Sequence, residues 1–190
     1  MLLEKLRELI LQDKNHELEE GYIHFLGRDF VRVTKHSGTR TVILDNEKIQ
    51  ELLEKNGRRY LEAHTHSRGD GHESDMAKPS RKDIEDFLFN DNSWGMIVIQ
   101  KYYKTGMPEG YFFLGKTQET EKYLKEMPNR KIRKFRLDLR RISRGKEKSC
   151  SVLEKFAEKY ALRLRVIPES GYKFCRYCFT FSSTQRKVAS

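Results

Sequence analysis

The stretch AHTHSRGDGHESDMAKPSRKDIEDF, residues 63–87, decides how the rest of the chain is interpreted. His64 and His66 stand one residue apart at the end of a strand expected over 58–66, so both side chains project from one face and can reach one ion. Residues 67–79 are polar and have no periodicity, which predicts a loop. The stretch is therefore either a metal site that does chemistry or a hydrophilic loop that is rich in histidine.

A helix is expected directly after this loop, over residues 81–89. Ser80 is a natural N-cap, and Asp83 takes the third helical position, as in a capping box. A hydrolytic zinc site needs three protein ligands and one open position for water. Asp83, in the first turn of the helix, could complete such a site with the two histidines.

Outward from this stretch, apolar periodicity predicts an α/β domain over residues 1–115. An amphipathic helix opens the chain, three strands and a second helix follow, and two strands come after the helix that contains Asp83. In order, the strands are expected at 19–27, 30–36 and 40–44, the second helix at 47–57, and the last two strands at 94–103 and 109–115.

Residues 116–190 predict a basic α+β extension. They hold 21 Lys and Arg against 8 Asp and Glu, a net charge of +13, whereas residues 1–115 have a net charge of −3. The densest run, 130–148, could bind nucleic acid or an acidic protein, or could be an ordinary solvated face. Aromatic residues are sparse in it, so a base-stacking platform is not indicated. The expected elements are a helix at 117–126, a basic strand-like stretch near 131–142, a helix at 151–162, and strands at 163–167 and 172–181.

Composition narrows the class of protein further. No run approaches the roughly 18–20 apolar residues that span a bilayer, and the N-terminus lacks the pattern of a signal peptide, so a cytoplasmic protein without a membrane partner is expected. Three cysteines do not make a disulfide framework. Cys175 and Cys178 form a CxxC within an expected strand, where positions i and i+3 point to opposite faces and suit a shared metal poorly.

The motifs H-T-H at 64–66 and P-S-R-K-D at 79–83, preceded by EEGYIHFLG at 19–27, resemble the JAMM (JAB1/MPN/Mov34) zinc metallopeptidases, of the prokaryotic- or virus-like JAB type. The likeness covers roughly residues 1–115 and includes the order of helices and strands. It implies a JAB/MPN-like mixed sheet flanked by helices, with the basic part of the chain as an extension.

The resemblance also implies the roles of individual residues. His64, His66 and Asp83 would bind Zn²⁺, and Ser80 would hydrogen-bond the oxyanion that forms during the reaction. A glutamate of the family commonly lies seven residues before the glycine that ends its strand. Counting back from Gly27 in this chain gives Glu20 as general base and later proton donor, with the preceding glutamate, Glu19, as the alternative.

The activity implied is that of a metalloprotease or isopeptidase. The usual substrates of the family are peptide or isopeptide bonds after the C-terminal glycines of ubiquitin or a ubiquitin-like protein, so a deubiquitinase-like activity is expected. An extended tail of that kind can be held by adding a strand to the edge of a sheet.

The chain departs from the family pattern in two places. Ser67 follows His66 where the family usually has proline, and sixteen residues separate His66 from Asp83 where the family usually has ten. A loop absorbs such an excess at small entropic cost, because closure cost rises only logarithmically with length. The extra residues include further candidates for the third ligand, namely Asp70, His72 and Asp75.

Other classes of metal-dependent enzyme agree less well with the sequence. The H-x-H of the PHP phosphoesterases needs further histidines downstream, but no histidine follows His72, and zinc deaminases need an H-x-E that the chain lacks. Two alternatives keep the fold: a RadC-like protein associated with nucleic acid, and a catalytically inactive JAB-fold binding module. The salt dependence of DNA binding would identify the first, and zinc content would identify the second.

Overall fold

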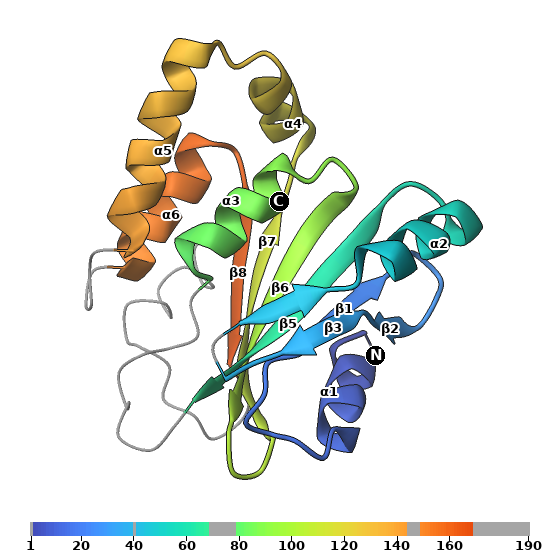
Figure 1. The fold of residues 1–190 in the computed structure, drawn as a ribbon. Coiled ribbons are helices and arrows are strands. Elements are labelled where there is room, and N and C mark those ends of the chain that lie inside the picture. The colour runs from blue at the N-terminus through green and yellow to red at the C-terminus, as the bar shows by residue number, and fades with distance from the viewer. Residues whose placement is uncertain (1, 40, 69–78, 144–148, 169–190) are drawn as a thin grey trace, which may run out of the picture.

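The computed structural model in Figure 1 is a mixed sheet with helices packed on both of its faces. The structure describes residues 2–39, 41–68, 79–143 and 149–168. A six-stranded sheet has the order β2-β1-β5-β6-β7-β8, and β3 and β4 form a separate two-stranded sheet. Strands β5 and β6 run parallel, while the other neighbours in the large sheet are antiparallel. The expected α/β class is confirmed.

The bounds of the elements agree with most of the expected ranges to within a few residues. None of the helices that the structure describes is long and apolar enough to cross a membrane. In chain order the elements are α1 (Leu2–Gln12), β1 (Gly21–His24), β2 (Phe30–Arg32), β3 (Thr34–Ser37), β4 (Val42–Leu44), α2 (Asn46–Asn56), β5 (Tyr60–Arg68), α3 (Arg81–Phe89), β6 (Ser93–Tyr102), β7 (Pro108–Gly115), α4 (Gln118–Lys125), α5 (Asn129–Ser143), α6 (Ser149–Lys159) and β8 (Arg163–Pro168).

Each face of the large sheet has its own hydrophobic core. On one face, side chains such as Val98 of β6 and Phe112 of β7 pack with α3, α5 and α6. On the other face, the next residue of β6, Ile99, packs with α1 through Leu6 and Ile10. Successive residues of a strand point to opposite faces, so burial on both faces makes these strands continuously apolar.

The C-terminal part shares the first of these cores instead of forming a body of its own. Phe135 and Leu139 of α5 and Phe156 of α6 are buried together with Phe87 of α3. Strand β8 extends the large sheet by pairing with β7 from Gly110↔Pro168 to Gly115↔Arg163. The expected boundary between 1–115 and 116–190 therefore does not separate two cores in the part of the chain that the structure describes.

Two expected elements are corrected. The stretch near 131–142 is a helix, α5, because its buried residues Phe135 and Leu139 are four apart and lie on one helical face, whereas its local alternation resembled a strand. The single strand expected over 30–36 is divided into β2 and β3 at Val33, whose N–H donates to Gly21 and whose carbonyl accepts from Asp45. The strand expected at 172–181, with Cys175 and Cys178, lies outside the described residues.

Candidate metal centre

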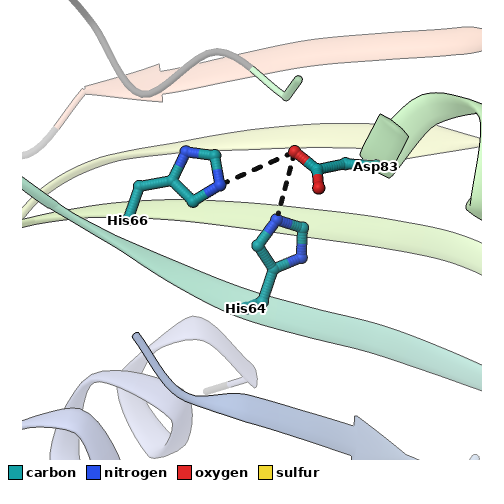
Figure 2. A group of neighbouring side chains, drawn as sticks. All are labelled: His64, His66 and Asp83. Carbon is teal, nitrogen blue, oxygen red and sulfur yellow. Dashed lines mark ion pairs between the residues drawn. The ribbon is translucent and has the colours of Figure 1, made fainter. Parts of the chain in front are cut away.

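His64 and His66 of β5 and Asp83 of α3 meet at one point, as Figure 2 shows. The Oδ2 atom of Asp83 lies 3.6 Å from Nε2 of His64 and 3.6 Å from Nε2 of His66. One ligand atom from each of the three residues lies within 4.8 Å of the others. The structure thus brings together the three ligands that the sequence predicted, and the sixteen intervening residues do not prevent it.

Strand pairing and a helix cap fix the positions of these side chains. The register of β5 with β6 sets His64 beside Val98 and His66 beside Gln100, so both imidazoles lie on the sheet face that α3 covers. At the start of α3, Ser80 Oγ accepts from the Asp83 N–H at 3.1 Å. In return the Ser80 N–H donates to Asp83 Oδ2 at 2.5 Å. This capping box turns the Asp83 carboxylate toward the histidines.

The apolar side of α3 holds this arrangement against the sheet. Ile84, Phe87 and Leu88 are buried in the core beneath the helix. Because these residues follow the cap directly, the first turn of α3 cannot shift without disturbing the core. The packing of the whole helix therefore helps to position the carboxylate.

Two observations indicate that these donor atoms are suited to a metal ion. His64 Nε2 is buried and has no hydrogen-bond partner among the described residues, and the 3.6 Å contacts are longer than hydrogen bonds. A carboxylate oxygen that faces two imidazole nitrogens is stabilised either by a metal ion between them or by a proton on one imidazole. Tetrahedral zinc with bonds of about 2.0–2.1 Å sets its ligand atoms about 3.4 Å apart, close to the observed spacing.

The protonation of the triad without metal follows the same electrostatics. Burial raises the pKa of Asp83, but the neighbouring His64 and His66 outweigh it and hold the pKa at about 2. Burial lowers the pKa of His66, and the charge of His64 adds to this effect, giving a pKa of about 4. For His64 burial also acts downward, but Asp83 overcomes it and the pKa is raised. The carboxylate is thus ionised and His66 is neutral at pH 7, which are the forms that bind metal.

Strand pairing shows where Glu20, the general base expected from the family pattern, lies relative to the histidines. Strands β1 and β5 are antiparallel with Gly21 opposite His64, and the Thr65 N–H donates to the Glu20 carbonyl at 2.9 Å. Glu20 therefore shares the face of Thr65, opposite to the face of the histidines. Glu19 lies before the paired residues of β1, with its N–H donating to the Gly38 carbonyl at 2.9 Å, and its carboxylate interacts electrostatically with His64 and Asp83 of the triad.

The contacts of the Glu20 carboxylate agree with this placement. It accepts from Arg32 Nε at 2.6 Å and Arg32 Nη2 at 2.5 Å, from Thr34 Oγ1 at 2.5 Å, and from Ser37 Oγ at 3.0 Å. Glu20 is 1% exposed, so this carboxylate is both buried and satisfied. It acts in the structure as the centre of a polar network on the α1 face and not as a member of the triad.

Glu19 has the surroundings expected of a proton-transfer group. It is 7% exposed, and burial raises its pKa from 4.5 to about 7. Among the charges that act on it, His64 and Lys101 lower the pKa and Asp83 raises it. Lys101 is itself fully buried, and its Nζ has no hydrogen-bond partner among the residues that the structure describes. Glu19, the alternative base in the sequence analysis, is thus electrostatically coupled to the triad.

One neighbour of the triad was missed by sequence reasoning. Glu62 lies two residues before His64 on the same face of β5, and burial raises its pKa to about 7, with the charges of His64 and Lys116 acting in the opposite direction. The pattern Glu-Ala-His-Thr-His, with an ionisable residue at every second position, was the available signal.

Of the two departures from the family pattern, the structure describes Ser67 but not residues 69–78. Ser67 lies within β5, paired with Lys101, and its hydroxyl donates to the His16 carbonyl at 3.0 Å. The strand therefore continues past His66, where a proline would remove a backbone donor. The alternative ligands in the loop, Asp70, His72 and Asp75, lie outside the described residues.

Comparison with protein-family models, curated proteins and solved structures yields no match for this chain. The fold and the triad are therefore argued from the residues themselves. They define a mixed α/β protein with a site that could hold a metal ion.

Proposed function

We propose that the chain is a zinc-dependent hydrolase of the JAMM type that cleaves peptide or isopeptide bonds at the C-terminus of ubiquitin or a ubiquitin-like protein. The observation that carries the proposal is the His64, His66 and Asp83 triad with the buried carboxylate of Glu19 coupled to it. Two imidazoles and one carboxylate form a ligand set found in hydrolytic zinc sites. The choice of substrate rests on the motif resemblance alone.

The three metal ligands share one role in this proposal, and Asp83 has a second. His64, His66 and Asp83 would hold Zn²⁺, which when bound supplies a water with a pKa of about 7 and polarises the scissile carbonyl. Asp83 has a second duty, because the same carboxylate closes the cap of α3. Truncation of the Asp83 side chain, which removes the oxygen as well as the charge, would therefore disturb both the metal and the start of the helix.

Glu19 is the proton-transfer residue of the proposed reaction. A general base works best when its pKa lies near the operating pH, and burial brings the pKa of Glu19 to about 7. In this role Glu19 accepts the proton of the attacking water and then delivers it to the leaving amine. The choice of Glu19 over Glu20 is supported by the hydrogen bonds that the Glu20 carboxylate already accepts from Arg32 and Ser37.

Ser80 is suited to stabilise negative charge on the substrate. Its Oγ accepts the Asp83 N–H, so the hydroxyl proton is still available for donation. The side chain is exposed, at the end of α3 where the triad lies. Donation from Ser80 to the substrate oxygen would strengthen as charge develops there.

The experiment is a hydrolysis assay on the full chain with ubiquitin carrying a fluorogenic C-terminal amide, and with a panel of ubiquitin-like proteins carrying the same group. We expect release of the fluorophore to stop when a chelator removes the metal and to return when zinc is added back. Glu19→Gln should abolish turnover, and the adjacent Glu20→Gln serves as the matched control. Absence of cleavage across the panel by metal-loaded protein, or full cleavage in chelator, would contradict the proposal.

A further inference from the structure

Helix α5 presents a strongly basic face to solvent. Figure 1 shows α5 on the outside of the helical layer, beside α3 and α6, which it also contacts. Its inner side is anchored by Phe135, whose ring centroid lies 4.9 Å from that of Tyr160 and 5.6 Å from that of Phe156. Leu139, one turn later, is fully buried. The direction in which α5 faces solvent is therefore fixed by the core.

The outer face of α5 consists of cations around one leucine. With 100° between successive residues, the direction opposite to the buried pair falls on Leu137, which is 47% exposed. Arg133 and Arg140 flank it on one side, and Lys134 and Arg141 flank it on the other, all four exposed. We call these five residues the α5 outer face; Lys131, which is exposed at the helix start, lies about 120° from Leu137 and outside this face.

The carboxylates near α5 are engaged at its flanks. Glu85 of α3 forms an ion pair with Arg136, with 3.2 Å between Arg136 Nε and Glu85 Oε1. Asp138 accepts from the Tyr160 hydroxyl at 2.8 Å and from Lys159, and lies 3.5 Å from Arg141 Nη1. No carboxylate of the described residues pairs with Lys131, Arg133 or Lys134. The outer face thus keeps its positive charge uncompensated at the N-terminal half of the helix.

Helix stability does not account for this arrangement. The preceding helix α4 has Glu119 and Glu121 in its first turn and Lys122 and Lys125 in its last, which complements the helix dipole. The first turn of α5 has no acidic residue, and basic residues stand there instead. Cations at the positive end of a helix are unfavourable, so neither the helix dipole nor a carboxylate of the described residues accounts for their presence.

We propose that the α5 outer face binds the phosphate backbone of a nucleic acid duplex. From Arg133 to Arg141 the helix rises about 12 Å, the length over which one strand of B-DNA presents about three or four phosphates. Guanidinium groups match phosphate oxygens in bidentate geometry. The only exposed apolar side chain on this face is Leu137, too little for a hydrophobic protein interface, and an aromatic stacking platform for single strands is lacking there.

This inference is independent of the metal triad and concerns a different surface. Contacts of this kind are made to the sugar–phosphate backbone of the nucleic acid, so the expected binding does not depend on base sequence. The number of phosphates contacted is measurable, because log K falls with log salt by about 0.9 per phosphate for duplex DNA.

The test compares two triple variants of the full chain by fluorescence anisotropy on a labelled 20-base-pair DNA duplex, from 50 to 300 mM KCl. K131Q/R133Q/K134Q removes three cations from the N-terminal half of α5, two of them on the α5 outer face, none of which pairs with a carboxylate of the described residues. K35Q/K55Q/R58Q removes three exposed cations from β3, α2 and the turn after α2, and so has the same net charge. We expect the first variant to bind at least about tenfold more weakly at 100 mM KCl, with a salt slope smaller by about 2–3, and the second to stay within about twofold of the unaltered chain.

Equal losses in the two variants would show that only the total charge of the chain matters and would overturn the inference, as would no binding of the duplex by the unaltered chain. Equally tight binding of polyglutamate would assign the face to an acidic protein instead. Thermal unfolding of the first variant provides the folding control. Its midpoint should not fall, because the substitutions remove cations from the positive end of the helix.

Discussion

Glu19 and Glu20 are adjacent residues that precede β1, and their buried carboxylates have different surroundings. Glu20, on the α1 face, accepts hydrogen bonds from Arg32, Thr34 and Ser37. Glu19 has a pKa raised by burial and influenced by His64 and Asp83. A buried polar cluster whose members all have partners stabilises the fold, whereas the group of His64, His66 and Asp83, in which His64 Nε2 has no hydrogen-bond partner among the described residues, could hold a metal ion.

The largest expected effect comes from the metal ligand on α3. Asp83→Asn keeps the size of the side chain and an oxygen that can accept from the Ser80 N–H, so the cap of α3 survives. The charge that balances a metal between two imidazoles is lost. We expect turnover to fall by more than about 10³-fold, as measured by the fluorogenic assay, because the metal leaves. Activity within tenfold of the unaltered chain would show that Asp83 is not a ligand.

The variant Glu19→Gln tests which of the two glutamates is the general base. Removal of a general base costs about 10²–10⁴-fold in rate, and the amide preserves the shape of the side chain. We expect this loss in kcat with metal content unchanged, measured by steady-state kinetics together with elemental analysis. Glu20→Gln, assayed below its unfolding temperature, should retain turnover. A reversal, with Glu20→Gln inactive and Glu19→Gln active, would restore Glu20 as the base.

The sequence was informative about the triad because the signals were local. His64 and His66 share a face through the period of a strand, and the Ser80 and Asp83 pair has the spacing of a capping box. The choice between Glu19 and Glu20 could not be made in this way. All four residues of β1 are buried. Burial along the strand therefore does not alternate, and it does not reveal whether the odd-numbered or the even-numbered residues point toward α3. Only the pairing of Gly21 with His64 decides it.

The error over α5 has a different cause. Its sequence alternates locally as KFRLDL, yet the spacing of Phe135 and Leu139 is helical, and the two periods coincide over short windows. The partner that selects between them is distant in the chain, since Phe135 packs on Phe156 and Tyr160 of the next helix and Phe89 of α3. The sharing of one core by α3, α5 and α6 was invisible for the same reason.

A smaller effect, on stability, is expected from Glu20→Gln. The substitution breaks a charge-assisted pair with Arg32, whose side chain is 55% exposed and can regain water. A buried group that loses part of its hydrogen bonding costs about 1–3 kcal/mol, and the exposure of Arg32 favours the lower part of that range. Urea unfolding monitored by circular dichroism measures the change. If the free energy of unfolding did not change, the network would contribute nothing to the fold.

The smallest effect is on the pH dependence of stability in the metal-free protein. The pKa of Glu19 is about 7 in the folded state against an ordinary value of 4.5, so between these values the folded chain binds more protons than the unfolded chain. Stability from Glu19 is complete below about pH 4.5 and is lost as the pH rises through 7, by at most about 1.4 kcal/mol per pH unit.

In Glu19→Gln this contribution disappears, so the difference in unfolding free energy between the unaltered chain and the variant should fall from pH 4.5 to 7 and be flat above about pH 8. Urea unfolding at each pH, with chelator present, provides the measurement. A flat difference throughout would mean that the Glu19 carboxyl is not desolvated in the folded protein.

The most direct test of the metal site is the metal content of the purified full chain, determined by elemental analysis beside Asp83→Asn and Glu19→Gln. A chain that holds zinc through His64, His66 and Asp83 and keeps Glu19 for proton transfer should contain about one zinc per molecule. Glu19→Gln should contain the same amount, and Asp83→Asn almost none. Absence of metal from the unaltered chain after incubation with zinc, or retention of a full equivalent by Asp83→Asn, would contradict the assignment of this triad as a metal centre.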